Sequence, residues 1–252
     1  MAWCDVTLAV KRAFPMSSRC IPLDEQVWAS YAESYDRILP ILPFYQEAVR
    51  RHVEALTGAG IRKVIDVGAG TGNVAVPLAS RGVEVTAVDL SNAMLDQLRG
   101  KIQSGLPGRI EIVEQDAHLL ERWPDAAFDG ANVLLALFPM YEPRQVLREI
   151  IRVVRPGGLI VATETRRNFQ LKPLLDFVDD FVERRPSRDE LREHWERVRS
   201  ANLVLDPGRR SERLSVEEMI DELATSGFTI HSVLDSHFGQ CATICAGKNA
   251  PQ

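Results

Sequence analysis

The sequence predicts an α/β protein built on a Rossmann-like, doubly wound sheet of seven strands, mostly parallel. Three observations lead to this prediction. Apolar runs rich in β-branched residues alternate along the chain with segments of helical periodicity, which is typical of a parallel sheet with helices on both faces. A glycine-rich loop, residues 68–72, directly follows the first strand-like run. Two strand-like runs joined by a short link close the chain, which predicts a hairpin and an antiparallel last strand.

The expected elements follow in order along the chain. Residues 24–57 have helical spacing, and Pro40 and Pro43 break the run before a second helix. The expected strands are 62–68, 83–89, 109–116, 130–138, 157–165, 228–235 and 239–248. The expected helices between them are 71–82, 91–102, 142–156 and 215–227. Ser91 is expected to act as an N-cap, and glycines 82 and 227 to end their helices.

This pattern divides the chain into four segments of one domain. The expected segments are an N-terminal helical cap (1–57), a Rossmann-like core (58–165), a charge-rich helical insertion (166–213) and the end of the core (214–252). We expect the insertion to pack over the carboxyl edge of the sheet and cover the site. A solvated helical excursion without a role in binding is the alternative.

Composition narrows the class of protein. With 252 residues, 45% of them hydrophobic, the chain can bury a substantial core. Its net charge of −5 argues against a generic nucleic-acid binder. No apolar run approaches the roughly 18–20 residues of a membrane span. Asp5, Lys11 and Arg12 interrupt any secretory signal, and either Met1 or Met16 can be the start. The four cysteines show no metal-ligand spacing, so we expect reduced thiols, a cytoplasmic location and no metal.

The glycine loop Gly68-Ala69-Gly70-Thr71-Gly72 lies at the expected carboxyl end of the first strand, where open parallel sheets bind ligands. A dinucleotide fingerprint reads G-x-G-x-x-G, and here the third glycine comes one residue early. A Walker loop requires G-K-[ST], and no lysine is present. The loop therefore departs from both phosphate-binding patterns.

Acids end the next strands. Asp89 closes the second strand, 23 residues after Asp66, where a carboxylate can accept bonds from both hydroxyls of a ribose. This fits an adenosine without a 2′-phosphate. Asp116 follows the third strand and can accept from an adenine amine.

Five stretches carry a family resemblance. In order they are VIDVGAGTGNVAV, VTAVDLSNAML, IEIVEQDA, FDGANVLLALF and VLREIIRVVRPGGLIVAT. They resemble the successive motifs of the class I S-adenosylmethionine-dependent methyltransferases, and more narrowly the branch that acts on small molecules. The resemblance covers about residues 28–165 and, more loosely, 214–248.

The resemblance implies S-adenosyl-L-methionine as cofactor and a small-molecule acceptor. The implied cofactor contacts are Asp66, Gly68, Ala69, Gly70, Gly72, Asp89, Leu90, Met94, Asp116, Ala117 and Leu134. The stretch WASYAESYD resembles a segment that folds over the cofactor, which implies that Tyr35 or Tyr31 lies near the sulfonium.

The chain departs from its relatives after the fourth strand. Leu137, Phe138, Pro139 and Met140 stand where relatives often have polar residues, which indicates an apolar acceptor. Phe138 and Tyr141 are therefore expected at the substrate. The N-P-P-Y element of nucleic-acid base methylases is missing, which argues against a base as acceptor.

Methyl transfer needs a general base only if the acceptor must lose a proton. His237, in the link after the sixth strand, is expected on the ligand face as a catalytic candidate, together with Tyr35 and Tyr31. Arg166 could clamp an acceptor carboxylate, and His194 is a further substrate candidate. Ordinary packing of the aromatic residues and a surface position of the arginine are the alternatives. His52 and His118 are expected on the surface.

Two rival functions remain open at this point. One is a nicotinamide-dependent oxidoreductase on a similar fold. The other is a cofactor-binding module without turnover, because methyl transfer requires no obligatory catalytic residue whose presence could be checked. The acceptor and the oligomeric state are not indicated by the sequence.

Overall fold

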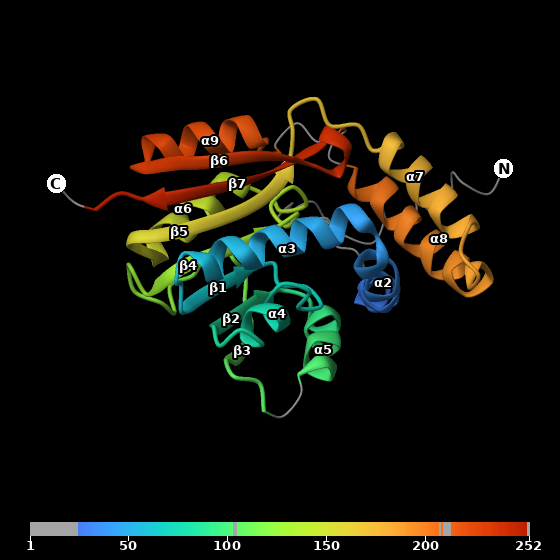
Figure 1. The fold of residues 1–252 in the computed structure, drawn as a ribbon, viewed down its shortest axis with the longest axis horizontal. Coiled ribbons are helices and arrows are strands. Elements are labelled where there is room, and N and C mark those ends of the chain that lie inside the picture. Colours follow the sequence, from blue (N-terminus) through green and yellow to red (C-terminus); the bar gives the residue numbers. More distant parts are fainter. Residues whose placement is uncertain (1–24, 103–104, 207, 209–212, 251–252) are drawn as a thin grey trace, which may run out of the picture.

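The computed structural model describes residues 25–102, 105–206, 208 and 213–250. The alternative starts Met1 and Met16, and the first part of the expected N-terminal cap, lie outside the described residues. The described chain forms a seven-stranded sheet in the order β3-β2-β1-β4-β5-β7-β6 (Figure 1). All neighbouring pairs from β3 to β5 are parallel, and β7 runs antiparallel to both β5 and β6. The predicted fold class is confirmed.

The strands begin and end close to the expected positions. Their bounds are β1 Lys63–Val67, β2 Glu84–Asp89, β3 Arg109–Glu114, β4 Phe128–Leu134, β5 Val154–Thr165, β6 Phe228–Ser236 and β7 Cys241–Lys248. The order places β1 and β4 side by side at the centre, where the chain reverses direction across the sheet. Open sheets of this kind bind ligands at that reversal point.

Helices cover both faces of the sheet. The bounds of those packed on the sheet are α3 Pro43–Gly58, α4 Ala75–Ala79, α5 Asn92–Lys101, α6 Pro143–Val153 and α9 Val216–Thr225. One apolar core joins α3, α4 and α5 to the face of β1 that carries Val64. A second core joins α6 and α9 to the opposite face, which carries Ile65 and Val67. Because side chains alternate along a strand, Asp66 lies on the same face as Val64 and points toward the α3 side.

Three further helices lie beyond the carboxyl ends of the parallel strands (Figure 1). They are α2 Glu25–Ile38, α7 Lys172–Glu183 and α8 Arg188–Leu205, and a 3₁₀ turn at Leu39–Ile41 links α2 to α3. They share an apolar cluster that includes Ile38, Val178 and Trp195. The described part of the insertion thus packs over the carboxyl edge, as its pattern predicted. Among the described residues, no helix combines the length and apolar character that a membrane crossing requires.

Two elements are shorter than predicted. The helix expected over 71–82 is only Ala75–Ala79: it begins late because Gly72 has a φ of 78°, and residues 80–82 after it form a turn. The strand expected over 130–138 ends at Leu134, because Leu135 takes a left-handed φ of 52°. The expected proline break and the Ser91 cap are confirmed, with Ser91 Oγ accepting from the Met94 amide at 3.4 Å.

The turn after β4 is held by a buried acid. One carboxylate oxygen of Glu164, at the end of β5, accepts from the amides of Ala136 at 3.0 Å and Leu137 at 2.7 Å. This turn lies against the glycine loop after β1, since a Cβ added to Gly68 would stand 2.4 Å from the Cβ of Ala136. Gly68 also has a φ of 67°, so both space and backbone conformation require glycine there.

The close approach of Gly68 to Ala136 predicts that two glycine-to-alanine substitutions lower the free energy of unfolding by different amounts. Gly82→Ala, at a φ of 83° with nothing near the added Cβ, should lower the free energy of unfolding by about 1–2 kcal/mol. Gly68→Ala should lower it by roughly 1–3 kcal/mol more, because the Cβ of Ala136 cannot rotate away. Urea unfolding of the two variants measures the difference, and equal losses would contradict the close approach of the two turns.

Candidate active site

A cavity of about 490 Å³ opens at the carboxyl ends of β1 to β4. It is lined by twelve of the residues predicted to bind cofactor or substrate: Tyr31, Tyr35, Gly68, Gly70, Asp89, Leu90, Met94, Asp116, Ala117, Leu134, Phe138 and Tyr141. We call it the cofactor cavity. Three predicted cofactor residues, Asp66, Ala69 and Gly72, are not on its wall. Gly72 instead packs under α5, where an added Cβ would stand 2.2 Å from Leu98 Cδ1.

Asp89 joins the glycine loop to the start of α5. Its Oδ2 accepts from the Gly70 amide at 2.8 Å, and its Oδ1 accepts from the Ser91 amide at 2.9 Å. Burial raises the pKa of Asp89, while these backbone hydrogen bonds oppose the shift. A carboxylate has about four lone-pair sites, so each oxygen can accept one more bond. The carboxylate is therefore arranged to receive two neighbouring hydroxyls.

Asp116 is held by two aromatic side chains. Its Oδ1 accepts from the amide and ring Nδ1 of His118, at 3.0 and 2.5 Å, and its Oδ2 accepts from the Tyr141 hydroxyl at 3.1 Å. Burial opposes ionisation, but these hydrogen bonds outweigh it and lower the pKa of Asp116. The rings of His118 and Tyr141 stack with centroids 3.7 Å apart.

Two placements here correct the sequence-based expectation. His118, expected in a solvated loop, is only 5% exposed because it packs between Asp116 and Tyr141. Tyr141, expected at the substrate, lines the cofactor cavity and bonds to Asp116. Both residues therefore support the acid at the expected adenine end of the cavity.

Asp66 ends a chain of buried hydrogen bonds. Asn132 Nδ2 donates to Asp66 Oδ1 at 2.6 Å, so the amide oxygen of Asn132 faces His52, where Nδ1 donates to it at 2.5 Å. Nε2 of His52 is then an acceptor and receives the Thr163 hydroxyl at 2.6 Å. The hydroxyl oxygens of Thr163 and Thr243 are 2.7 Å apart, which extends the chain to β7.

His52, expected at the surface, is fully buried in this chain. Burial lowers the pKa of His52 to about 4, so the ring is neutral at physiological pH and keeps the proton on Nδ1. Burial also raises the pKa of Asp66 to about 7. Asp66 Oδ2 is buried and has no hydrogen-bond partner among the described residues.

A second cavity, of about 120 Å³, lies under α2, α7 and α8. We call it the apolar cavity, because aliphatic and aromatic side chains make up most of its wall, among them Phe44, Leu175, Val178 and Trp195. Tyr31, Tyr35, Leu135 and Phe138 line both cavities, so the two adjoin at these four residues.

The two tyrosines at this junction belong to an aromatic group. The rings of Tyr31 and Tyr35 lie 5.5 Å apart, and Tyr35 shares a 2.9 Å hydrogen bond with the Tyr45 hydroxyl. Burial raises the pKa of both Tyr31 and Tyr35 well above the ordinary tyrosine value, so these phenols are neutral. They offer ring faces and hydroxyl groups to the junction without carrying charge.

Polar contacts fasten α2 to the glycine loop. Asp36 accepts from the Thr71 hydroxyl at 2.7 Å and forms an ion pair with Lys101. Lys101 Nζ also donates to Asn73 Oδ1 at 3.0 Å, and Asn73 Nδ2 donates to the Tyr45 hydroxyl at 3.2 Å. The helix that carries Tyr31 and Tyr35 is thereby tied to the loop that begins the cofactor cavity.

His237 lies where the sequence predicted, in the link after β6, and is 4% exposed. It lines the apolar cavity beside Thr165 and Cys241. Burial lowers the pKa of His237 to about 4. Its Nε2 has no hydrogen-bond partner among the described residues.

The structure brings two predicted substrate residues to neither cavity. Arg166 forms ion pairs with Glu217 at 3.1 Å and Asp235 at 2.5 Å, so its guanidinium neutralises these acids instead of facing an acceptor. His194 lies on α8 with Nδ1 3.1 Å from the Ser34 hydroxyl. Its neighbour Trp195 reaches the apolar cavity instead.

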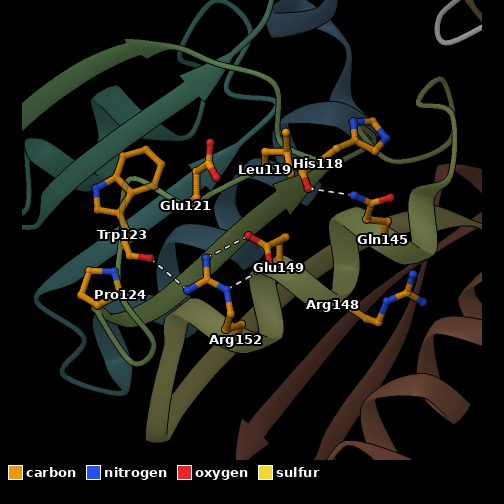
Figure 2. Close-up of a pocket in the computed structure, with 9 residues that line it drawn as sticks. All are labelled: His118, Leu119, Glu121, Trp123, Pro124, Gln145, Arg148, Glu149 and Arg152. Atoms are coloured by element: carbon orange, nitrogen blue, oxygen red, sulfur yellow. Dashed lines mark hydrogen bonds and ion pairs between the residues drawn. The ribbon is translucent and has the colours of Figure 1, made fainter.

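Figure 2 shows a separate hollow beside α6. The Arg152 guanidinium there donates to the Glu149 carboxylate at 2.8 Å and to the backbone carbonyls of Trp123 and Leu120 at 2.9 and 3.0 Å. This hollow holds none of the predicted cofactor or substrate residues, and its partly exposed Arg152 is paired with Glu149. The candidate site is therefore the pair of adjoining cavities.

The residues of the cofactor cavity fit S-adenosylmethionine. Asp89 can receive two ribose hydroxyls, and Asp116 lies at the next strand end to accept from adenine. Gly70 opens onto the cavity, with nothing within 4 Å of an added Cβ. Asp66 is not on the wall of this cavity, but its buried Oδ2 has no partner among the described residues and could accept from the cofactor's ammonium group.

Comparisons with known proteins agree with this geometry. A family described as "Methyltransferase domain" matches residues 65–162. Demethylmenaquinone methyltransferase from Thermotoga maritima is 32% identical over 162 residues, which cover 58% of this chain and 68% of that protein. The chain belongs to the class I S-adenosylmethionine-dependent methyltransferases. The chain spans about half to two thirds of the length of other curated relatives.

Two further methyltransferases illustrate the similarity. Phosphatidylethanolamine N-methyltransferase from Cereibacter sphaeroides is 35% identical over 135 residues, 53% of this chain and 62% of that protein. The crystal structure of magnesium protoporphyrin IX methyltransferase from Synechocystis PCC 6803 with bound S-adenosylhomocysteine superposes with a TM-score of 0.61. That match has 17% identity and covers 90% of this chain and 100% of the other, and it shows the shared fold.

Several residues of this methyltransferase site were not predicted from the sequence. Asn132 and Thr163 are polar residues inside apolar strand runs, and His52 falls among the buried positions of an amphipathic helix. A polar residue on the core face of a helix or strand needs a buried partner, which is the signal that could have joined them. Thr165 is likewise a polar residue at the end of an apolar strand run.

The arrangement of Asp89 predicts its contribution to cofactor binding. Asp89→Ala should weaken S-adenosylhomocysteine binding by on the order of 1–3 kcal/mol, because charge-assisted hydrogen bonds to the ribose are lost. Asp96→Ala, an exposed acid on the following helix, is the matched control and should bind normally. Titration calorimetry gives both dissociation constants, and equal values would refute the assigned role of Asp89.

The raised pKa of Asp66 predicts a pH dependence. Burial raises the pKa of Asp66 from the ordinary 3.8 to about 7, so its protonated form contributes to folding stability fully below about pH 4, and this contribution is lost as the pH rises to 7. Cofactor binding needs the ionised acid and has the opposite dependence. S-adenosylhomocysteine should therefore bind about tenfold more weakly at pH 6 than at pH 8. Asp66→Asn should bind weakly with little change over this range, and a wild-type-like slope in that variant would exclude Asp66 as the cause.

Proposed function

We propose that the protein transfers a methyl group from S-adenosyl-L-methionine to a small, largely apolar acceptor held in the apolar cavity. The observation that carries this proposal is that the cofactor cavity and the apolar cavity adjoin at Tyr31, Tyr35, Leu135 and Phe138. The methyl group of a cofactor bound in the cofactor cavity can therefore reach an acceptor in the apolar cavity without passing through solvent.

S-adenosylmethionine, when bound, supplies an activated methyl group on a sulfonium, so the protein mainly needs to align the acceptor and exclude water. Asp89 and Asp116 would hold the adenosine, and Asp66 the ammonium group. The faces of Tyr31 and Tyr35 can stabilise positive charge at the junction. Both tyrosine hydroxyls are neutral, so the two rings present their faces without placing a phenolate anion at the junction.

The proposal assigns roles to the four segments of the chain. Residues 58–165 and 214–252 would form the cofactor-binding core, and 1–57 and 166–213 a cap over the acceptor. Residues of α2, α7 and α8 on the wall of the apolar cavity support this division. A small molecule in place of a nucleic acid, and a cytoplasmic location, are included in the proposal on the grounds of charge and cysteine usage.

The names of two relatives are consistent with an apolar acceptor. One is named for phosphatidylethanolamine and the other for demethylmenaquinone, both of which carry large apolar parts. The apolar cavity, of about 120 Å³, is suited to a ring-sized portion of such a molecule, since its described lining residues include no Asp, Glu, Lys or Arg. Burial of apolar surface would then provide most of the binding free energy.

The proposal predicts transfer of radiolabelled methyl groups from S-adenosylmethionine to an apolar acceptor. A panel of quinols, phenols and phosphatidylethanolamine is incubated with the protein, and organic-extractable label is counted. We expect transfer to at least one compound and micromolar binding of S-adenosylhomocysteine, with no binding of NAD. Asn202→Trp should obstruct the apolar cavity and lower transfer while S-adenosylhomocysteine still binds.

The matched control is Arg197→Trp, on the exposed side of the same helix, which should retain transfer. Normal S-adenosylhomocysteine binding with no transfer to any acceptor would support a binding module without turnover. Tight NAD binding without a response to S-adenosylhomocysteine would support an oxidoreductase.

A further inference from the structure

Two polar atoms on residues that line the apolar cavity have no hydrogen-bond partner among the described residues. They are Nε2 of His237 and Oγ1 of Thr165, on residues that are 4% and 1% exposed. Buried polar atoms are nearly always hydrogen-bonded, because leaving one unpaired costs free energy. Two such residues on the wall of one cavity therefore indicate a polar group on a ligand.

The sheet brings these two residues to the same edge. Thr165 is the last residue of β5 and pairs with Cys241, the first residue of β7. Cys241 pairs in turn with Ser236, the last residue of β6, which directly precedes His237. Strand pairing thus places Thr165 and the residue before His237 at the same end of the sheet, on the two strands that flank β7.

The imidazole of His237 is held in a defined orientation. Its Nδ1 lies 2.7 Å from the Ser236 hydroxyl, and its ring packs against Phe44 with centroids 4.8 Å apart. With the proton on Nδ1 donated to Ser236, Nε2 is an acceptor. His237 and Phe238 both take left-handed backbone conformations, with φ of 50° and 57°. Such strain in residues other than glycine is often found at functional sites.

The surroundings define the ligand further. The described wall has no lysine or arginine, and its one histidine, His237, is kept neutral by burial, so an acceptor carboxylate or phosphate would remain uncompensated and the ligand is neutral. Phe44, Phe138 and Trp195 offer aromatic surfaces. The volume of about 120 Å³ suits one ring, since a cavity of about 150 Å³ holds benzene.

We propose that the apolar cavity binds a neutral phenol, whose hydroxyl donates to His237 Nε2 while Thr165 Oγ1 bonds to the same oxygen. Within the proposed function, on which this step rests, the phenol oxygen forms a bond to the methyl carbon as the carbon–sulfur bond breaks. The electron pair of that bond stays on sulfur, and the phenol proton passes to Nε2. His237 is then an imidazolium and releases the proton when the methyl ether leaves.

A weak base is sufficient for this step. Burial keeps the His237 ring neutral at physiological pH, ready to accept a hydrogen bond. The hydroxyl proton becomes far more acidic as its oxygen bonds to carbon, so the transfer does not require a strong base. His237 acts on the acceptor, and Thr165 orients it.

The test measures binding and does not depend on turnover. Phenol and toluene are single rings of nearly the same shape and differ by a hydroxyl in place of a methyl group. Their dissociation constants are measured by NMR titration with S-adenosylhomocysteine at saturation. We expect His237→Asn to lower the preference for the phenol about fivefold, the value of one hydrogen bond, and Thr165→Val to lower it about two- to fivefold. Asparagine tolerates the left-handed backbone at this position.

His231→Asn, at an exposed histidine on β6, the strand that precedes His237, is the matched control and should leave the preference unchanged. Unchanged S-adenosylhomocysteine binding in all three variants shows that they are folded. Equal preferences in the wild type and His237→Asn, or no saturable binding of the phenol, would overturn the proposal, even if methyl transfer to another acceptor is found. Loss of the preference in His237→Asn and Thr165→Val supports it, even if no transfer is detected.

Discussion

The site depends on one chain of buried hydrogen bonds, from Thr243 through Thr163, His52 and Asn132 to Asp66. Each member lies on a different element, so the chain connects β7, β5, α3, β4 and β1 at the level where the parallel strands end. A one-residue slip of any of these strands would turn its polar group to the other face. That would leave buried partners unpaired, at about 1–3 kcal/mol each.

The direction of these hydrogen bonds matters as much as their number. Every donor from Thr163 onward points toward Asp66, which favours a carboxylate at the end of the chain. Burial acts against that charge, and the balance raises the pKa of Asp66 to about 7. The free acid is thus close to its protonation midpoint in neutral solution. A cation that bonds to its open oxygen would shift it to the ionised form.

The sequence predicted the fold and the cofactor cavity more completely than the acceptor side. The strand segments, the final hairpin and the positions of Asp89 and Asp116 follow from local patterns, because in an open parallel sheet the strand ends meet at one edge. His52 and His118 were misplaced because the burial of a histidine depends on partners from remote segments, such as Asn132 and Tyr141. The ion pairs of Arg166 with Glu217 and Asp235 likewise join residues about 50 to 70 positions apart. Local periodicity contains no information about such pairs.

The attachment of α2 couples the two cavities. Tyr31 and Tyr35 of this helix form part of the wall of both cavities, and Asp36 ties it to Thr71 and Lys101 beside the cofactor loop. In the proposed function, the surface against which the acceptor rests is therefore complete only while α2 is docked on the cofactor loop. The two ligands would then depend on the position of the same helix.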